Sequence, residues 1–279
     1  TSYKYTPETI KEHLSHSIKD SSEFSVIKYG VGFHSPMPFE ITDFFLNDPR
    51  QGPPHLNKGL LTEKGFQHCV DCVDAMVEAI DGKAQLALDC GPGWVLSDAI
   101  RFAKEMEKYP ILWLEDMLTG DRSNHVGVAE YKELTTSTTT PIHTGEQIYL
   151  RQGFRELIQN RAVRVIGPDP MDVGGLAELK WIAEFADLYG IQIAPHGVFN
   201  GLLGLAAMTQ VCATMPENLI AFEYCKPPSE WWFDIVDGLP EKLIVDGHIK
   251  VWDTPGIGVT LNEEKTRKYL RPEDQDFFD

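Results

Sequence analysis

Seven ionisable side chains stand at the ends of successive apolar runs, and their types suit acid–base chemistry at one shared site. Three of them, Asp89, Glu115 and Glu146, end neighbouring runs. Like charges placed close together raise one another's pKa unless a cation neutralises them. Ligation by carboxylate oxygens alone suits a hard ion, so we expect these three residues to bind Mg²⁺, ahead of Mn²⁺ or Ca²⁺.

Asp169 and His196 end the next two runs and form a second group. An Asp that hydrogen-bonds one imidazole nitrogen fixes the tautomer and raises the basicity of the other nitrogen, which makes the pair a general base. Beside a divalent cation, such a base would remove the proton next to a substrate carboxylate, and the cation would stabilise the enediolate that forms. Lys28 and Glu223 end the two remaining runs.

The runs themselves are typical of strands in a parallel sheet. They cover residues 24–28, 85–89, 111–115, 141–146, 163–169, 191–196 and 219–223. From Asp89 onward their last residues are 26, 31, 23, 27 and 27 positions apart, which is the length that a strand, a helix and two loops require. Contact with solvent explains one charged residue at a strand end, whereas seven in succession favour a common mouth.

Amphipathic segments between the runs predict helices. Residues 97–109 begin with a serine suited to capping, and residues 176–189 are followed by Gly190, a helix stop signal. A further helix is expected over about residues 6–19, preceded by residues 3–5 as the remnant of a first strand. Strand–helix units repeated in this way predict a TIM-type (β/α) barrel, an α/β fold.

The remaining segments define the expected domain organisation. Residues 1–238 would form the catalytic barrel, with a proline-rich insertion over its mouth at about residues 33–65. Residues 239–279 would form a C-terminal hairpin, turning at Asp246-Gly247, and an acidic tail.

The composition excludes several classes of protein. Among 279 residues, 42 are acidic and 25 basic, and the net charge of −17 disfavours nucleic-acid and membrane-surface partners. No apolar stretch is long enough to span a bilayer, and the N-terminus has no signal-peptide core. The five cysteines form no disulfide framework, which favours a reducing cytoplasm, and the Cys69–Cys72 spacing is explained by helix packing.

Taken as a set, short motifs over about residues 6–261 resemble the mandelate racemase branch of the enolase superfamily. The motifs are Asp89 after Leu-Ala-Leu, Trp113-Leu-Glu115-Asp, Thr144-Gly-Glu146, Pro168-Asp169 followed by Gly174-Gly175, Ala194-Pro-His196, and Glu223. The resemblance implies that Asp89, Glu115 and Glu146 ligate Mg²⁺ and that Asp169 and His196 form the base. It also implies that Glu223, in protonated form, donates to or hydrogen-bonds the substrate carboxylate.

Two departures from the family pattern refine this expectation. Cys90-Gly91 follows Asp89, where the family usually has Asn at the second position. Many racemising members end the second strand with Lys-x-Lys, whereas this chain has Lys28-Tyr29-Gly30, so the second lysine, usually the opposing base, is replaced by Gly30. One-base chemistry is therefore favoured.

The resemblance then implies an acid-sugar dehydratase, a hydro-lyase. His196 would abstract the proton, a β-hydroxyl would leave, and the product would be a 2-keto-3-deoxy acid. Lys28 would be a charge partner for the substrate carboxylate, and His34 is a candidate second acid or substrate contact.

Three alternatives stay open at this point. A racemase or epimerase would need a second base, for which Lys28 is the candidate. A retaining glycoside hydrolase could use Glu115 and Glu223 without a metal, but would leave the carboxylate triplet unexplained. A metal-binding homologue without turnover is the third. The family also implies a homo-oligomer, a small sugar acid as substrate, and an N-terminal capping domain. That domain is not among these 279 residues, and residues 239–279 would pack on it.

Overall fold

A six-stranded parallel sheet forms the centre of the computed structural model, which describes residues 4–20, 24–46, 60–118, 127–197, 201–224 and 230–279. The strands pair in chain order and are β1 (Val26–Gly30), β2 (Gln85–Asp89), β3 (Ile111–Glu115), β4 (Ile142–Thr144), β5 (Val165–Ile166) and β6 (Gln192–Ile193). A parallel bridge between Ile193 and Leu219 adds the seventh predicted run beside β6.

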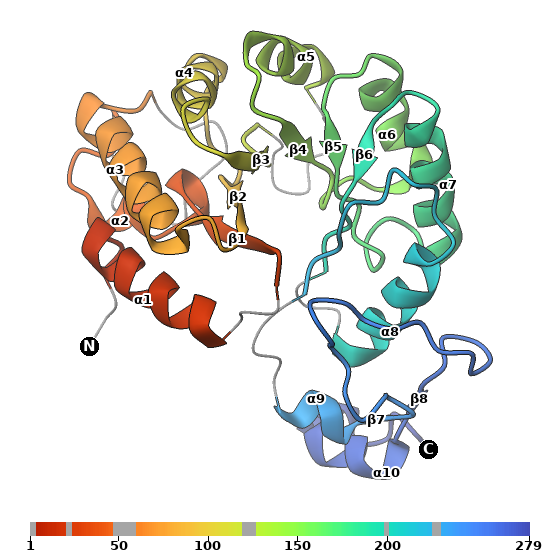
Figure 1. Ribbon diagram of the computed structural model, residues 1–279. Coiled ribbons are helices and arrows are strands. Elements are labelled where there is room, and N and C mark those ends of the chain that lie inside the picture. The colour runs from red at the N-terminus through yellow and green to blue at the C-terminus, as the bar shows by residue number, and fades with distance from the viewer. Residues whose placement is uncertain (1–3, 21–23, 47–59, 119–126, 198–200, 225–229) are drawn as a thin grey trace.

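Helices surround this sheet on its outer side (Figure 1). They are α1 (Pro7–Asp20), α3 (Glu63–Ile80), α4 (Leu96–Met106), α5 (Val128–Ser137), α6 (Leu150–Gln159), α7 (Leu176–Asp187) and α8 (Gly201–Cys212). Each buries an apolar stripe against the strands or a neighbouring helix, and α1 packs on α3. Parallel strands in chain order inside a ring of helices agree with the expected TIM-type barrel.

Side chains that alternate along each strand face either the core beneath the helices or the interior of the barrel, where the site lies. In β2, Leu86 and Leu88 belong to the large core beneath the helices, whereas Ala87 belongs to a separate cluster with Trp113. Successive side chains of a strand point to opposite faces, so Asp89 shares the face of Ala87, and Glu115 that of Trp113. The inward-facing positions thus end in a carboxylate on both strands.

Helix α4 differs at both ends from the prediction. Val95 is its N-cap, and Ser97 lies inside the first turn, where no side-chain cap forms. The helix ends at Met106, three residues before the predicted Tyr109, and residues 107–108 form a turn before Pro110, which disfavours helical backbone at Tyr109. Helix α7 likewise ends at Asp187, and Gly190 follows with a positive φ of 68°, as the stop signal predicts.

The expected strand remnant at residues 3–5 is not seen in the part that the structure describes, because Lys4 and Tyr5 are in no strand. Side-chain contacts hold Tyr5 instead. Its backbone N–H donates to Glu40 Oε2 at 2.6 Å, and its hydroxyl donates to the carbonyl of Gly30. Tyr5 therefore lies across the carboxyl end of β1, and does not extend the sheet.

The expected insertion at residues 33–65 is described only in part, since residues 47–59 lie outside the described ranges. Its described part contains η1 (Gly32–His34), the one-turn helix α2 (Met37–Glu40) and an antiparallel bridge between Phe45 and Leu61. Thr62 then caps α3, its hydroxyl accepting from the N–H of Gly65. Cys69 and Cys72 are buried in α3, which confirms the packing role predicted for them.

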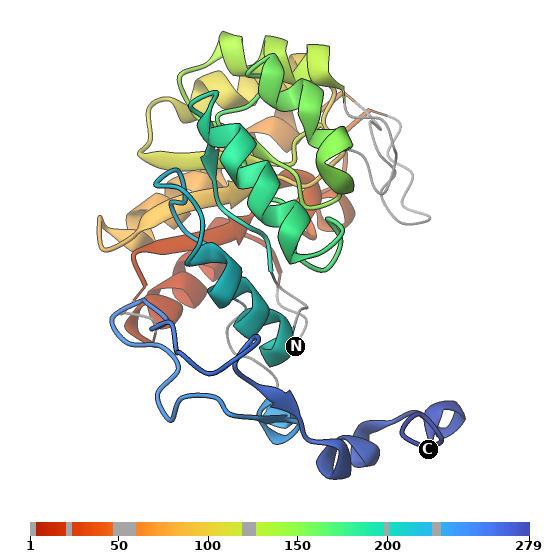
Figure 2. The same cartoon turned by 90° about the vertical axis from the view of Figure 1, so that its right-hand side faces the viewer.

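The C-terminal segment contains β7 (Val236–Asp237) and β8 (Thr260–Leu261), which pair antiparallel, with the short helices α9 (Glu230–Asp234), α10 (Glu263–Thr266), η2 (Arg267–Tyr269) and η3 (Pro272–Asp274). The regular pairing starts at Val236, outside the predicted hairpin. Inside that hairpin, Pro240 and Pro255 remove backbone donors, and only the turn at Asp246-Gly247 is closed by a bridge. Figure 2 shows the last helices extending away from the barrel.

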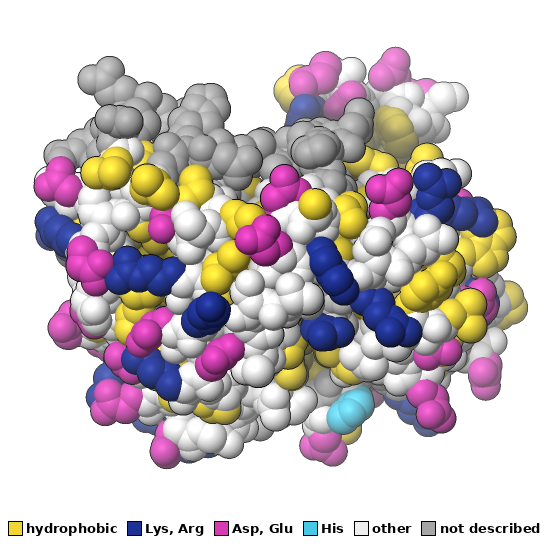
Figure 3. Space-filling view, turned by 90° about the horizontal axis from the view of Figure 1, so that it is seen from above, with side chains coloured by type: hydrophobic (Ala, Val, Ile, Leu, Met, Phe, Trp, Pro, Cys, Tyr) yellow, Lys and Arg dark blue, Asp and Glu magenta, His cyan; other side chains and the backbone are white. Residues whose placement is uncertain are grey.

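The outer surface mixes charges of both signs. Figure 3 shows Lys and Arg side chains interspersed with Asp and Glu over the helices that lie uppermost in Figure 1. The excess of negative charge is therefore not gathered into one patch on this face. Among the helices that the structure describes, none combines the length and the apolar character that crossing a membrane requires.

Candidate active site

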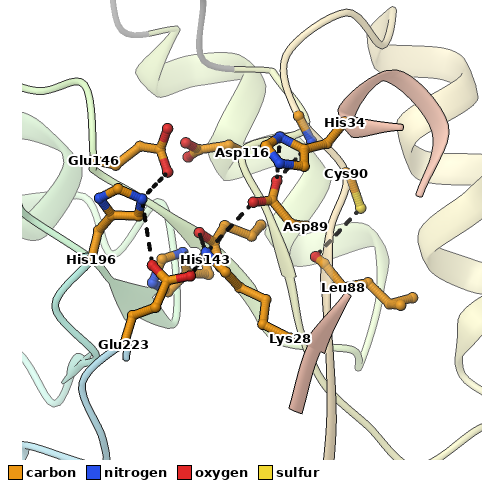
Figure 4. Close-up of polar contacts among 12 residues, drawn as sticks. Lys28, His34, Leu88, Asp89, Cys90, Asp116, His143, Glu146, His196 and Glu223 are labelled. Atoms are coloured by element: carbon orange, nitrogen blue, oxygen red, sulfur yellow. Dashed lines mark hydrogen bonds and ion pairs between the residues drawn. The ribbon is translucent and has the colours of Figure 1, made fainter. Parts of the chain in front are cut away.

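All eight residues predicted for the site lie together at the carboxyl ends of the strands. Figure 4 shows Lys28, His34, Asp89, Glu146, His196 and Glu223 pointing toward one another, and ion-pair contacts link Glu115 to Lys28, and Asp169 to His196. Lys28 lies in β1 and His34 follows it, whereas the other six residues come from six different strands or runs, so the parallel barrel is what brings them to one place.

The carboxylate triplet has the geometry of a cation site. Asp89, Glu115 and Glu146 each offer one oxygen, and these oxygens lie within 4.8 Å of one another. Asp89 and Glu115 are buried, and Glu146 is partly exposed. Convergent carboxylate oxygens with one open side are the donor set that Mg²⁺ and similar hard ions prefer, so these residues fit the expected metal.

Lys28 lies inside this cluster. Its Nζ is 2.6 Å from Glu115 Oε1, 3.0 Å from Glu223 Oε1 and 3.5 Å from Asp89 Oδ2. Burial lowers the pKa of Lys28, but the charges of these three carboxylates outweigh burial and raise that pKa well above its ordinary value. The ammonium therefore stays charged and offsets part of the repulsion between the acids.

The same contacts shift the pKa values of Asp89 and Glu115 in opposite directions. Burial and the charge of Glu115 raise the pKa of Asp89 to about 6, although Lys28 and His34 act in the opposite direction. Burial would also raise the pKa of Glu115, but Lys28, His143 and hydrogen bonds from Lys28 and Trp113 lower it to about 2. Glu115 is thus the firmly ionised member of the pair.

Asp169 and His196 form the predicted pair. His196 Nδ1 is 2.6 Å from Asp169 Oδ2, and the other oxygen of Asp169 accepts from the N–H of Met171 at 2.7 Å. His196 Nε2 faces the cluster, 3.3 Å from Glu146 Oε2 and 3.4 Å from Glu223 Oε2. Asp169 therefore fixes one nitrogen, and the other points into the carboxylate cluster.

These neighbours also set the protonation of His196. Burial lowers the pKa of the imidazole, but the hydrogen bond to Asp169 and the charges of Glu146 and Glu223 together raise it to about 9. With these partners the ring carries a proton at neutral pH. It must lose that proton before it can act as a base.

A close packing explains why Gly30 replaces a lysine. A Cβ atom at Gly30 would lie 2.4 Å from the carbonyl oxygen of His34, and one at Gly91 would lie 2.6 Å from the Cβ of His34. Only glycines at these positions let the loop of His34 approach the strand ends. The half-exposed ring of His34 is 3.2 Å from Asp89 Oδ1 and faces His196 across the cluster (Figure 4).

Three residues at the site were not predicted to act there. Asp116 is buried and accepts a hydrogen bond from Thr144, and burial together with the charges of Glu146 and Glu115 raises its pKa well above the ordinary value. Trp113 and His143 are buried beside Glu115. Asp116 and Trp113 belong to the quoted Trp-Leu-Glu-Asp motif, whereas no pattern in the sequence distinguishes His143.

A barrel of strand–helix units whose mouth joins a carboxylate triplet to an Asp–His pair is a barrel domain of the enolase type. The chain belongs to the family described as enolase C-terminal domain-like, which matches residues 24–265. The family resemblance found in the sequence motifs is thereby confirmed.

Several curated relatives carry dehydratase names. The chain is 33% identical over 255 residues to the D-xylonate dehydratase of Haloferax volcanii, covering 91% of this chain and 60% of that protein. It is 26% identical over 214 residues to the L-talarate/galactarate dehydratase of Salmonella typhimurium, covering 75% of this chain and 49% of that protein. The chain therefore spans at most three fifths of the length of these two relatives.

Solved structures agree on the fold. A mandelate racemase/muconate lactonizing enzyme-like protein from Rubrobacter xylanophilus superimposes with a TM-score of 0.77 at 30% identity, over 95% of this chain and 61% of that chain. A putative dehydratase from Salmonella superimposes with a TM-score of 0.76 at 27% identity, over 95% of this chain and 62% of that chain. These likenesses confirm the expected enolase-superfamily barrel.

Proposed function

We propose that this chain is the catalytic barrel of a Mg²⁺-dependent hydro-lyase that dehydrates a sugar acid to a 2-keto-3-deoxy acid. The observation that carries the proposal is the contact between the two predicted groups. Nε2 of His196, the nitrogen left free by Asp169, is 3.3 Å from Glu146 of the carboxylate triplet. A base and a cation site share one edge, as removal of a proton next to a carboxylate requires. The dehydratase names of the relatives support this choice.

Asp89, Glu115 and Glu146 would hold the Mg²⁺ ion. When bound, the ion supplies positive charge that attracts the substrate carboxylate and acidifies the adjacent C–H bond. The remaining groups act on the organic part of the substrate. Lys28 and Glu223 lie 3.0 Å apart beside the triplet. There Lys28 balances the negative charge of the substrate carboxylate, and Glu223 in its protonated form donates a hydrogen bond to it.

The elimination needs one base and one acid. His196 removes the proton next to the carboxylate, and the electron pair of that C–H bond ends in a C=C bond as the neighbouring C–O bond breaks. The hydroxyl leaves as water after it receives a proton. His34, which faces His196 across the cluster, is the candidate donor of that proton. The enol that results tautomerises to the 2-keto-3-deoxy acid.

Two observations disfavour the racemase or epimerase alternative. Lys28, its candidate second base, is held as a charged ammonium by three carboxylates and has no lone pair with which to accept a proton. The packing around Gly30 excludes a second base at position 30. A second base at this position would need a side chain where the backbone of His34 already lies. A glycosidase is disfavoured as well, because Glu115 is 1% exposed and both Glu115 and Glu223 pair with Lys28. A buried, ion-paired carboxylate cannot reach a glycosidic bond.

A substrate screen tests the proposal. The intact protein is incubated with a panel of sugar acids, with and without Mg²⁺, and 2-keto acid formation and α-proton exchange in D₂O are measured. Keto acid that forms only with Mg²⁺ is the expected result. Exchange or epimer formation without keto acid would instead make the protein an epimerase. If Mg²⁺ binds but neither keto acid nor α-proton exchange is detected, the result would favour a homologue that binds the metal without turnover.

Two variants assign the roles. His196→Asn should lower α-proton exchange by about 10²- to 10⁴-fold, the usual contribution of a general base, and leave Mg²⁺ affinity intact. Exchange that survives would transfer the base role to Lys28.

Glu146→Gln should weaken Mg²⁺ binding in calorimetry, because an amide oxygen carries no full charge. Unchanged affinity would remove Glu146 from the ligand set.

A further inference from the structure

The two oxygens of Glu115 are held by different kinds of donor. Oε1 accepts from the ammonium of Lys28 at 2.6 Å, and Oε2 accepts from the indole N–H of Trp113 at 2.8 Å. Trp113 precedes Glu115 by two residues on β3, so both side chains point to the inside of the barrel. Glu115 and Trp113 are both buried, which excludes water from this contact.

The indole of Trp113 is itself fixed by its surroundings. His143, paired with Glu115 across β3 and β4, stacks on the indole with ring centroids 5.1 Å apart and planes 19° apart. His143 Nε2 lies 3.3 Å from the carbonyl oxygen of Ala194 on the far side of β5. Between them, Gly167 has no side chain, and a Cβ there would lie 2.3 Å from the imidazole. The stacked rings therefore cannot shift toward β5.

The two donors differ in how they would respond to a cation. Lys28 is positively charged, so a divalent ion bound by Glu115 would repel it. The indole N–H is neutral and can only donate, so it neither competes with the ion nor ligates it. Trp113 is the partner that can keep Glu115 oriented both before and after the ion binds.

We propose that Trp113, stacked on His143, is a positioning residue that orients the Glu115 carboxylate for the divalent cation. This inference rests on the proposed cation site. Donors behind a metal ligand fix its orientation, and their loss typically lowers metal affinity by about 10- to 100-fold. The competing explanation is that Trp113 only fills the barrel interior and that Glu115 satisfies its N–H. That explanation predicts that the affinity for the cation does not depend on the N–H.

The experiment removes the N–H and keeps the ring. Mg²⁺ and Mn²⁺ titrations of the intact protein are followed by calorimetry for the wild type, for Trp113→Phe, and for a protein that carries β-(3-benzothienyl)alanine at position 113. The benzothiophene ring has nearly the shape of indole and lacks the donor, so it serves if the phenylalanine variant does not fold. 5-Fluorotryptophan at the same position keeps the donor and is the rescue control. Trp181→Phe, which changes an exposed tryptophan of α7, is the matched control.

We expect both donor-free proteins to bind Mg²⁺ and Mn²⁺ about 10- to 100-fold more weakly. The 5-fluorotryptophan protein and Trp181→Phe should bind like the wild type. Without a cation the benzothienyl protein should still unfold cooperatively, at a temperature lowered by the loss of one hydrogen bond to buried Glu115. Wild-type affinity in the benzothienyl protein would overturn the inference and leave the proposed function standing. A wild type that binds neither ion would contradict the cation site itself, which separates the two failures.

Discussion

At the scale of single residues, the site balances more negative charge than its one lysine can neutralise. Lys28 contacts Asp89, Glu115 and Glu223 together. Its charge stabilises buried Asp89 and Glu115 and partly exposed Glu223 in the absence of a cation, because an unpaired buried carboxylate is costly. The same charge opposes a divalent ion that binds to Asp89 and Glu115. Lys28 is therefore expected to stabilise the fold and to weaken cation binding at the same time.

Lys28→Met separates these two effects. We expect the variant to bind Mg²⁺ up to about tenfold more tightly, because a repelling charge is removed at close range. Without Mg²⁺ it should unfold at a lower temperature than the wild type, and added Mg²⁺ should restore most of the loss. Calorimetric titration and thermal unfolding with and without the ion measure both effects.

Lys83→Met is the control for this experiment, because Lys83 is exposed and contacts only Asp81 among the described acidic residues. It should behave like the wild type. Weaker Mg²⁺ binding by Lys28→Met would show that the lysine supports the cation site and does not compete with it.

At the scale of elements, one buried asparagine joins the strand that leads to His196 to its neighbours. The side-chain N–H₂ of Asn218 donates to the carbonyl oxygens of Ala183 in α7 and of Ile191 just before β6, both at 3.0 Å. The backbone of Asn218 accepts from the N–H of Ile193, which aligns the seventh run with β6. Because β6 itself has two residues, these contacts replace a longer ladder of backbone bonds.

Asn218→Ala should lower the free energy of unfolding by about 2–4 kcal/mol, since two buried carbonyl groups lose their donor. Urea denaturation measures the change. Asn160→Ala is the matched control, because the exposed side chain of Asn160 also donates to a backbone carbonyl, that of Glu156. Its effect should stay within about 0.5 kcal/mol. Equal losses of unfolding free energy in the two variants would contradict the structural role of Asn218.

At the scale of the whole molecule, buried thiols make the fold sensitive to alkaline pH. All four cysteines in the described part of the chain are buried and free of disulfides. Burial raises the pKa of Cys212 from 9.0 to about 12, and burial with the charges of Asp71 and Glu8 does the same for Cys72. The folded state therefore keeps protons that the unfolded chain releases above its ordinary thiol pKa. The contribution of these protonated thiols to the free energy of unfolding is fully present below that pKa and is lost as the pH rises toward 12.

Cys212→Ala should weaken this alkaline dependence. Between about pH 9 and 12 one protonated thiol in the folded state contributes a slope of up to about 1.4 kcal/mol per pH unit, and the variant lacks this contribution. Urea denaturation at pH 7, 9 and 10 tests this, with pH 7 giving the constant cost of the smaller side chain. Stability curves that stay parallel for wild type and variant up to pH 10 would contradict the expectation.

The position of the site residues was predictable from the sequence because the rule behind it is local. A strand of five residues with an apolar interior, followed by a helix of about three turns, places its last inward side chain at the barrel mouth whichever neighbours it has. Asp89 and Glu115 satisfy this rule one strand at a time, whereas His196 lies three residues beyond the two-residue strand β6. The sequence motifs then separated the acids proposed to ligate a metal from the residues proposed as the base.

The helix ends and the C-terminal pairing were less predictable. Ser97 has the residue type of a cap, but Val95 takes that position, where the chain leaves the loop after β2. Capping depends on backbone angles that neighbouring elements impose, and residue type alone does not determine them. The pairing of Val236 with Leu261 joins residues 25 positions apart, and no short-range pattern specifies such a contact.

The amino-acid order is sufficient for the barrel and for the set of acids at its mouth, because hydrophobic periodicity and spacing act within single strand–helix units. The contacts between those acids depend on tertiary structure. Lys28 reaches across from β1 to Glu115 on β3, and His143 on β4 packs on Trp113 only because Gly167, just after β5, leaves the space. Such contacts join side chains from separate units, and their geometry exists only once the barrel has assembled around them.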